Sequence, residues 1–332
     1  MLSATPAPWS FAAPWGGQGW LTELGGLVHW VEYGAARRIG RARATPLVLV
    51  HGLGGSHLNW ALVGSALAAD RRVLVPDLRG FGMTRAAGGD VTVGGNATLL
   101  DRFIREVVGE PVVLIGNSMG GLISIMHTHR NPETVTGLVL VDPALPAVPN
   151  QLDRSTAATL LRCGLPGLGE RYLPGAEPGA SAARQARQVI ELCFADPRRA
   201  SEPLLAASEA LLTARRWIPG TEAAFLAATR SLVRVVGGVR RYRAMMSGIE
   251  VPVLLMHGES DRLVSVNAAR HAAAANPAWD TCFLPDVGHA PQLEAPDLFV
   301  DAVTHWLTGL ADTVELAAYA APTPAETDVS AL

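Results

Sequence analysis

The sequence predicts an α/β fold in which helices cover both faces of a mostly parallel sheet. Short runs of Val, Leu and Ile recur along the chain, and helical patterns separate them. Continuous apolar runs of this length are typical of strands that are buried on both faces. Strands that alternate with helices are joined by right-handed crossovers, and this connection makes the sheet parallel.

Six buried strands and one hairpin are predicted. The strands span Pro46–Val50, Arg72–Pro76, Pro111–Ile115, Leu138–Val141, Val251–Met256 and Cys282–Leu284. Before them, the residues from Trp20 to Tyr33 alternate around Gly25-Gly26, which predicts a β-hairpin with a tight turn. Helices are predicted over Thr98–Val108 and Pro291–Leu310, where apolar side chains recur at helical spacing.

The strand and helix pattern divides the chain into four parts. The α/β core is predicted over residues 19–144 and 250–311. Residues 145–249 are rich in Ala, Leu and Arg and show no strand pattern, so we expect a helical cap over the carboxyl edge of the sheet. Residues 1–18 are expected to form an irregular arm. Residues 312–332 lack periodicity and contain Pro, Thr, Ala and acids, which predicts a disordered tail.

Composition excludes several classes of function. The 332 residues carry a net charge of only −3, so neither nucleic acid nor an anionic membrane is an expected partner. The chain contains no Lys, which excludes a Schiff-base lysine, a lysine-bound cofactor and a P-loop. Cys163, Cys193 and Cys282 are too few and scattered for a disulfide framework or a zinc site. Neither a signal-peptide pattern nor an apolar run of about 20 residues is present, so a cytoplasmic protein without an integral membrane segment is expected.

The strongest chemical motif is Gly116-Asn117-Ser118-Met119-Gly120-Gly121. It follows a predicted strand and opens a helical stretch, which is the context of a G-x-S-x-G nucleophile elbow. The sharp turn is expected to hold Ser118 in a strained conformation with its Oγ exposed, and Gly116 and Gly120 leave room for that turn. The N-terminus of the following helix offers free N–H groups where an oxyanion would form.

A serine nucleophile needs a base, and the base needs an acid that orients it. Asp261 stands just past the strand Val251–Met256, and His289 stands just past the next strand. Residues at the carboxyl ends of parallel strands face the ligand, and Ser, acid, His is the chain order expected after such an elbow. The sequence therefore predicts Ser118, Asp261 and His289 as a catalytic triad.

Two other carboxylates compete for the role of the acid. Asp142 follows the strand Leu138–Val141, a position from which some hydrolases take their acid, and Glu259 lies two residues before Asp261. Asp261 is preferred over both.

His127 and His129 are two residues apart on a predicted helix and face different sides, so we expect one buried and one solvated His rather than a metal pair. We predict neither a metal nor an organic cofactor.

The second half of an acyl-transfer site is an oxyanion hole. One donor is expected to be the backbone N–H of Met119, directly after the nucleophile. The other is expected from His51-Gly52-Leu53-Gly54-Gly55, the loop after the first buried strand, whose glycines let the backbone approach a substrate. This loop is not a dinucleotide fingerprint, because G-x-G-x-x-G would require glycine where His57 stands.

Together these motifs resemble the cap-bearing branch of the α/β-hydrolase superfamily. The resemblance extends from Trp20 to Leu310 and includes the glycine loop, the elbow, Pro76-Asp77-Leu78-Arg79-Gly80-Phe81-Gly82, His257–Asp261 and Gly288-His289-Ala290-Pro291. It implies that Ser118 is the nucleophile, His289 the general base and Asp261 its partner. It also implies that Leu53 gives the second oxyanion N–H.

Several residues of this chain differ from those typical of particular families within the superfamily, and these differences narrow the expected activity. Haloalkane dehalogenases and epoxide hydrolases carry Asp where Ser118 stands, and proline iminopeptidases have a Pro in the HGGPG loop and a Trp in the elbow. Meta-cleavage-product hydrolases have a similar elbow, but usually a Pro in the glycine loop and an aromatic residue after the histidine, where this chain has Gly54-Gly55 and Ala290. We therefore expect a carboxylic-ester hydrolase acting on a small apolar ester or related acyl substrate. A C–C bond hydrolase and a non-catalytic ligand-binding protein are the alternatives, and the sequence does not indicate an oligomeric state.

Overall fold

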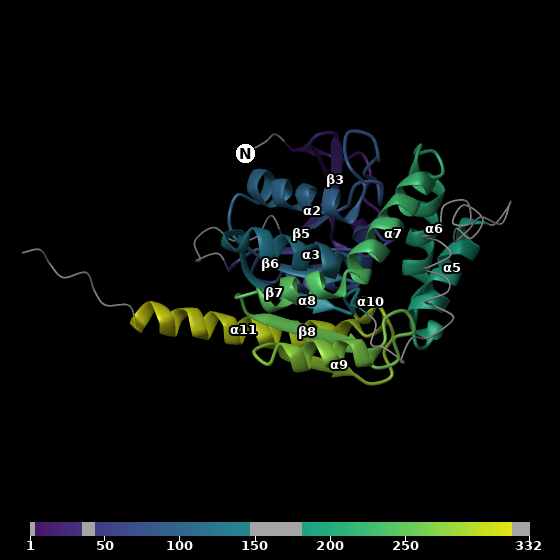
Figure 1. Cartoon of the computed structure of the whole chain (residues 1–332). Coiled ribbons are helices and arrows are strands. Elements are labelled where there is room, and N and C mark those ends of the chain that lie inside the picture. The colour runs from purple at the N-terminus through teal and green to yellow at the C-terminus, as the bar shows by residue number, and fades with distance from the viewer. Residues whose placement is uncertain (1–3, 35–43, 147–180, 321–332) are drawn as a thin grey trace, which may run out of the picture.

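The computed structural model describes residues 4–34, 44–146 and 181–320, with side chains described as far as residue 310. In this part of the chain, nine strands form one sheet with helices on both faces (Figure 1). The strand order across the sheet is β1-β2-β3-β5-β4-β6-β7-β8-β9. The α/β fold with a mostly parallel sheet is therefore confirmed.

The six predicted strands form the parallel part of the sheet. They are β4 (Leu47–Val50), β5 (Val73–Pro76), β6 (Val112–Asn117), β7 (Val135–Val141), β8 (Val253–Gly258) and β9 (Asp280–Leu284). The predicted hairpin is also confirmed: β2 (Gln18–Glu23) pairs antiparallel with β3 (Leu27–Tyr33). Its turn contains Gly25 and Gly26, both at positive φ, a conformation that glycine adopts without strain.

Each face of the sheet has its own apolar core, as expected for strands whose side chains alternate between faces. One core includes Val48 and Leu114, which belong to a cluster with side chains from α2 (Val93–Arg102), α3 (Met119–Arg130) and α9 (Val266–Ala275). The other core packs alternate residues of the same strands against α1 (Ala61–Leu67) and α11 (Pro296–Ala320). This double cover explains why the strands read as unbroken apolar runs.

The described residues between β7 and β8 are mostly helical. They form α5 (Ala182–Cys193), α6 (Glu202–Arg215), α7 (Thr221–Gly237) and α8 (Val239–Ser247), here named the insertion helices. Figure 1 shows α5 and α6 standing together beyond one end of the sheet, while α7 and α8 reach the core, where Ala228 of α7 and Tyr242 of α8 belong to the same apolar cluster as α2 and α3. Part of the predicted cap, including Leu160 and Leu161, lies outside the described residues.

Both ends of the chain differ from the sequence prediction. The predicted irregular arm contains a short strand, β1 (Thr5–Pro6), which pairs with β2, and a 3₁₀ turn over Ala13–Trp15. The predicted tail begins at residue 312, but α11 continues to Ala320. Residues 312–320 include three Ala and one Leu, which favour helix, and the prolines of this region come only after Ala320. Residues 321–332 lie outside the described part.

Two predicted helices have different bounds. The helix predicted from Thr98 begins at Val93, where Thr92 accepts a hydrogen bond from the N–H of Gly95 as an N-cap, and its last part, Phe103–Val108, is π-helical. The helix predicted over Pro291–Leu310 is interrupted before Pro296, so that α10 (Pro291–Glu294) and α11 are separate. Among the helices that the structure describes, none has the length and apolar character needed to cross a bilayer.

Candidate active site

Ser118 occupies a strained turn between β6 and α3. Its φ of 56° and ψ of −117° lie outside the regions that L-residues favour. The backbone around it holds this turn, because the N–H of Ser118 donates to the carbonyl of Val141 at 3.0 Å and its carbonyl accepts from the N–H of Ala144 at 3.0 Å. The predicted strand, turn and helix are confirmed, and so is the strained backbone at Ser118.

The glycines of the elbow are required by close backbone contacts. A Cβ on Gly116 would lie 2.5 Å from the carbonyl oxygen of Gly120, across the turn. A Cβ on Gly120 would lie 2.1 Å from the carbonyl oxygen of Val50, at the end of β4. These distances are too short for any side chain, so the elbow is pressed against the strand that leads into the predicted oxyanion loop.

Asp261 and His289 come together at the carboxyl edge of the sheet. The Nδ1 atom of His289 lies 2.7 Å from Oδ2 of Asp261, and both side chains are almost fully buried. Oδ1 of Asp261 also accepts hydrogen bonds from the N–H groups of Leu263 and Val264, at 2.7 and 3.1 Å. Burial alone would raise the pKa of Asp261, but the charge of His289 and the hydrogen bond from its ring hold that pKa below the ordinary value.

This contact determines which nitrogen of His289 carries a proton. An ionised carboxylate can only accept hydrogen bonds, so Nδ1 of His289 donates to Asp261. In the neutral ring the other nitrogen, Nε2, is then an acceptor. A base in this tautomer can take a proton from a neighbouring hydroxyl group.

Asn117 ties the loop of His289 to the elbow, a role that the sequence reasoning missed. Its side chain donates to the carbonyl oxygens of His289 and Val141, both at 3.1 Å, and it directly precedes Ser118 in the chain. Asn117 and His289 are 172 positions apart, so no local pattern in the sequence signals this contact. This hydrogen bond fixes the backbone of the base, His289, to the residue that precedes the serine.

Glu294 is a second residue that the sequence reasoning missed. Its buried carboxylate accepts from the N–H of Gly288 at 2.7 Å, directly before His289. It also accepts from the N–H groups of Ala195 and Asp196, which follow α5. Glu294 therefore joins the histidine loop to the insertion, through backbone groups that carry no sequence signal.

The predicted oxyanion loop lies beside the elbow. A Cβ on Gly52 would be 3.1 Å from Cβ of Ser118, so the loop after β4 passes directly over the serine. Within the described part of the chain, the N–H groups of Leu53 and Met119 donate to no protein acceptor. They are therefore free to receive a substrate oxygen, and their role as oxyanion donors stays a prediction.

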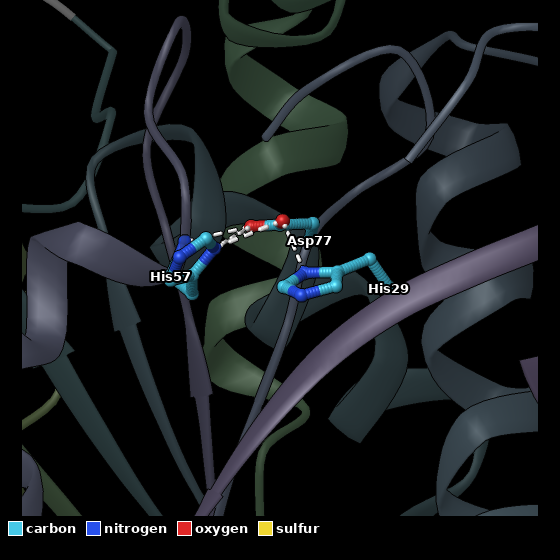
Figure 2. A group of neighbouring side chains, drawn as sticks. All are labelled: His29, His57 and Asp77. Carbon is cyan, nitrogen blue, oxygen red and sulfur yellow. Dashed lines mark hydrogen bonds and ion pairs between the residues drawn. The ribbon is translucent and has the colours of Figure 1, made fainter. Parts of the chain in front are cut away.

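A buried cluster of two histidines and one aspartate fixes this loop to the sheet. Oδ2 of Asp77 lies 2.8 Å from Nδ1 of His29 and 3.0 Å from Nδ1 of His57, while Oδ1 accepts the N–H of His57 at 2.7 Å (Figure 2). Oδ2 also accepts the N–H of Met83. All three side chains are fully buried, and Nε2 of each histidine has no partner among the residues that the structure describes. Sequence reasoning missed this cluster because its members lie on three separate segments.

Electrostatics keeps Asp77 ionised. Burial alone would raise the pKa of Asp77, but the charge of His57 and the hydrogen bonds from His29 and His57 outweigh it and hold the pKa well below its ordinary value.

Two groups of side chains bring atoms that could bind a metal ion within 4.8 Å of one another. They are His29, His57 and Asp77, and Asp142, His257 and Asp261. In the first group both carboxylate oxygens of Asp77 already accept hydrogen bonds, from two backbone N–H groups and from both rings.

Replacing Asp77 by Asn should destabilise the protein strongly. The amide offers one acceptor oxygen where four donors now converge, so buried N–H groups lose their partner. Removal of one member of a buried ionic cluster costs about 3–5 kcal/mol of unfolding free energy, which urea titration would measure. Asp101→Asn is the matched control, because it removes a partly exposed pair with Arg105 and should cost about 0.5 kcal/mol or less. A loss below about 1 kcal/mol for Asp77→Asn would contradict the assigned role.

The same variant should change how stability depends on pH. The pKa of Asp77 is lower in the folded state than in the unfolded chain, so its contribution is complete above the unfolded value of about 3.9 and is lost as the pH falls toward the folded value. Unfolding free energies measured from pH 5 downward should therefore fall less steeply for Asp77→Asn than for the wild type.

The remaining predicted residues lie as follows. Asp142 is buried at the end of β7 and lies near His257, whereas Glu259 is partly exposed and pairs with Arg270. His127 is buried against Thr134 and His129 is exposed, so the expectation of one buried and one solvated histidine is confirmed. Cys193 and Cys282 are free thiols, and Cys163 lies outside the described residues.

Comparison with known proteins decides the family. The model of the alpha/beta hydrolase family matches residues 47–302. This range includes the glycine loop after β4, the elbow around Ser118 and the residues of the predicted triad. The chain belongs to the alpha/beta hydrolase family. This α/β hydrolase is 30% identical over 284 residues to the dihydrolipoyllysine-residue acetyltransferase component of the acetoin cleaving system of Pseudomonas putida. The match covers 83% of this chain and 65% of that protein, so the chain spans slightly less than two thirds of that relative's length.

A relative of comparable length is an esterase. The pimeloyl-(acyl-carrier protein) methyl ester esterase of Aeromonas hydrophila is 26% identical over 261 residues, which are 79% of this chain and 94% of that protein. Among solved structures, a thermophilic esterase from Thermogutta terrifontis matches with a TM-score of 0.64 and 22% identity, over 87% of this chain and 97% of its own. At that identity the structural likeness shows the fold alone. The relatives of this α/β hydrolase support hydrolytic activity.

Proposed function

We propose that this α/β hydrolase cleaves carboxylic esters through a Ser118–His289–Asp261 triad and an acyl-enzyme intermediate. The observation that carries the proposal is the 2.7 Å contact between Nδ1 of His289 and Oδ2 of Asp261, in a loop that Asn117 ties to the strained serine. The type of bond is supported by the methyl ester esterase among the relatives. The proposed chemistry needs only a nucleophile, a base and oxyanion donors, all of which this chain supplies.

The proposed reaction uses the groups in a fixed order. Ser118 Oγ attacks the ester carbonyl carbon while its proton passes to Nε2 of His289. The carbonyl oxygen becomes negatively charged and accepts hydrogen bonds from the N–H groups of Leu53 and Met119. When the intermediate collapses, the alcohol leaves with the proton from His289. Water then attacks the acyl-enzyme by the same route and releases the acid and free Ser118.

Asp261 assists this reaction without becoming protonated. Its carboxylate fixes the ring of His289 through Nδ1 and stabilises the imidazolium that forms when Nε2 takes the serine proton. The two backbone N–H groups that bind Oδ1 keep the carboxylate from rotating away. The acid is therefore oriented before any substrate binds.

An apolar acyl group fits the surroundings of the loop. A Cβ on Gly54 would lie 3.2 Å from the ring of Phe225, so insertion helix α7 covers the loop that carries Leu53. Leu53 and Phe225 are both partly buried and pack against the same apolar core. Apolar side chains next to the reacting carbonyl favour an apolar substrate because they cannot replace the hydrogen bonds that a polar one has in water.

The same loop argues against the C–C bond alternative. The proline typical of the first glycine loop of the meta-cleavage-product hydrolases is absent here, because this chain has Gly54-Gly55 in its place. Gly54 has a φ of 74°, which proline, restricted to a φ near −65°, cannot adopt. Ala290 likewise leaves no aromatic ring next to His289. These two differences support an ester as the substrate.

The proposal is tested by labelling and by turnover on matched substrates. A fluorophosphonate reacts with a serine that has both a base and oxyanion donors, so it should label Ser118 and no other serine. Mass spectrometry of the labelled peptide identifies the residue. In parallel, p-nitrophenyl esters of rising acyl length should be hydrolysed, and a vinylogous diketone should be cleaved much more slowly.

The other outcomes distinguish the alternatives. A label on Ser56 or Ser260 would contradict the assignment of the nucleophile. Faster turnover of the diketone than of every ester would favour the C–C hydrolase. Folded protein that neither reacts with the fluorophosphonate nor hydrolyses an activated ester would favour a non-catalytic, ligand-binding protein.

A further inference from the structure

Asp142 is a second buried carboxyl group close to the proposed triad. It follows β7, has a φ of 43°, and is fully buried. Its Oδ1 accepts the N–H of Gly258 at 2.9 Å, but its Oδ2 is buried and has no hydrogen-bond partner among the described residues. A buried carboxylate oxygen without a donor is costly, whereas a protonated oxygen can donate to a neighbouring acceptor.

The neighbours of Asp142 include another acid. One carboxylate oxygen of Asp142, one of Asp261 and a ring nitrogen of His257 lie within 4.8 Å of one another. Nε2 of His257 is 3.6 Å from Asp142 and 3.5 Å from Asp261, but it lies closer, at 3.0 Å, to the carbonyl oxygen of Val264. Since a carbonyl only accepts, the ring N–H of His257 is directed to Val264 and does not neutralise either acid fully.

The hydrogen bonds identify which of the two acids is ionised. Asp261 accepts from His289, Leu263 and Val264, all of which are donors, whereas Gly258 is the one donor to Asp142 in the part of the chain that the structure describes. Two carboxylates at this separation in a buried site cannot both hold a negative charge at low cost. Asp261, which has more donors, keeps the charge and Asp142 takes the proton.

Burial and the nearby carboxylates also favour a proton on Asp142. Burial raises the pKa of Asp142 well above its ordinary value, and the negative charges of Asp261 and of Glu294 on α10 add to this. The N–H of Gly258 acts in the opposite direction. Among the described residues, the other titratable groups that interact with the pair include His257 on β8, His289 after β9 and Cys193 on α5, and Arg262 acts on Cys193.

We propose that Asp142 is a positioning residue that remains protonated at neutral pH and donates its O–H to the carboxylate of Asp261. The two acids then hold one proton and one negative charge between them, and the charge stays on the member that contacts His289. The effect on catalysis rests on the proposed function, whereas the protonation state of Asp142 does not.

Infrared spectroscopy tests the protonation state without turnover. A protonated carboxyl group has a C=O stretch that a carboxylate lacks, so the wild type at pH 7 should show this band and Asp142→Asn should not. Asp101→Asn, which removes a partly exposed acid, is the matched control and should retain the band. A wild type without the band at pH 7, or a band that persists in folded Asp142→Asn, would overturn the proposal.

Kinetics of two variants tests the positioning role. Asn tolerates the positive φ of Asp142, and its amide can accept from Gly258 and donate to Asp261, so Asp142→Asn should keep kcat/KM within about threefold. Asp142→Gly is also compatible with the positive φ at this position, but it removes the group that donates to Asp261. Without that donor Asp261 stabilises the imidazolium form of His289 further, so the acid limb of the pH–rate profile should move to higher pH.

The infrared and the kinetic experiments separate the failure of this proposal from the failure of the proposed function. If the proposed function is wrong, no variant has measurable esterase activity and the infrared result still decides the protonation of Asp142. If Asp142→Asn is folded, lacks the band and has lost more than about 100-fold in kcat/KM, Asp142 is needed as a carboxylate and the positioning role is wrong. An acid limb that stays unchanged in folded Asp142→Gly would also overturn that role.

Discussion

Ser118→Ala is expected to abolish ester hydrolysis and leave the fold intact. The hydroxyl is the proposed nucleophile, and the alanine side chain cannot form the acyl-enzyme in its place. Members of a triad act as a unit, so kcat should fall by about 10⁴-fold or more. The substitution removes one oxygen atom from a partly exposed side chain and leaves the Cβ and the backbone contacts of the turn in place. The unfolding free energy should therefore change by less than about 1 kcal/mol.

The measurement pairs turnover with a stability check. Purified Ser118→Ala and Ser260→Ala should be compared on the best p-nitrophenyl ester, with thermal unfolding of each. Ser260 is the matched control because it lies beside Asp261 in the chain and has no proposed role. If Ser118→Ala keeps a tenth of the wild-type rate, the nucleophile lies elsewhere.

The second large effect is expected for Asp261→Asn. An amide in this position can donate toward His289 instead of accepting from it, which favours the tautomer whose free nitrogen faces the wrong side. A loss on the order of 10⁴-fold in kcat is the known scale of such a change. The backbone donors of Leu263 and Val264 can still bind the amide oxygen, so the variant should fold.

Glu259→Gln is the matched control for this experiment. It changes the nearest rival acid by the same chemistry, but Glu259 is partly exposed and pairs with Arg270, away from His289. Its kcat should stay close to that of the wild type. An inactive but folded Glu259→Gln beside an active Asp261→Asn would show that Glu259, and not Asp261, is the acid.

The parallel sheet was predictable because its strands are buried on both faces. Runs such as Val48 to Val50 and Leu138 to Val141 have no polar residue to break them, so the positions of these strands could be predicted from the sequence, although β7 begins three residues earlier, at Val135. The short strand Thr5–Pro6 could not, because two residues carry no periodicity and are held only by pairing with β2. The end of α11 was missed because residues 312–332 show no apolar periodicity, whereas the helix continues through Leu316, Ala317 and Ala318 as far as Ala320.

The candidate site was predictable where short motifs carry it. Ser118 is marked by its flanking glycines, and Asp261 and His289 by their places after strands, so their proximity followed from the order of the sheet. Asn117, Glu294 and the cluster around Asp77 were not predictable. Their side chains bind backbone groups of distant segments, such as Ala195 for Glu294, and no local pattern records such a contact.

The separation of the site residues along the chain has a consequence for folding. The bond from Asn117 to His289 closes a loop of 172 residues, and β8 pairs with β7 only after the whole insertion has been made. The chain entropy lost in closing long loops must be overcome before their contacts stabilise the structure, so such contacts tend to form late. During synthesis, strands β2 to β7 can associate first, while β8 and β9 are still to come. The elbow is then built early, and the histidine loop joins it only when the last third of the chain has emerged from the ribosome.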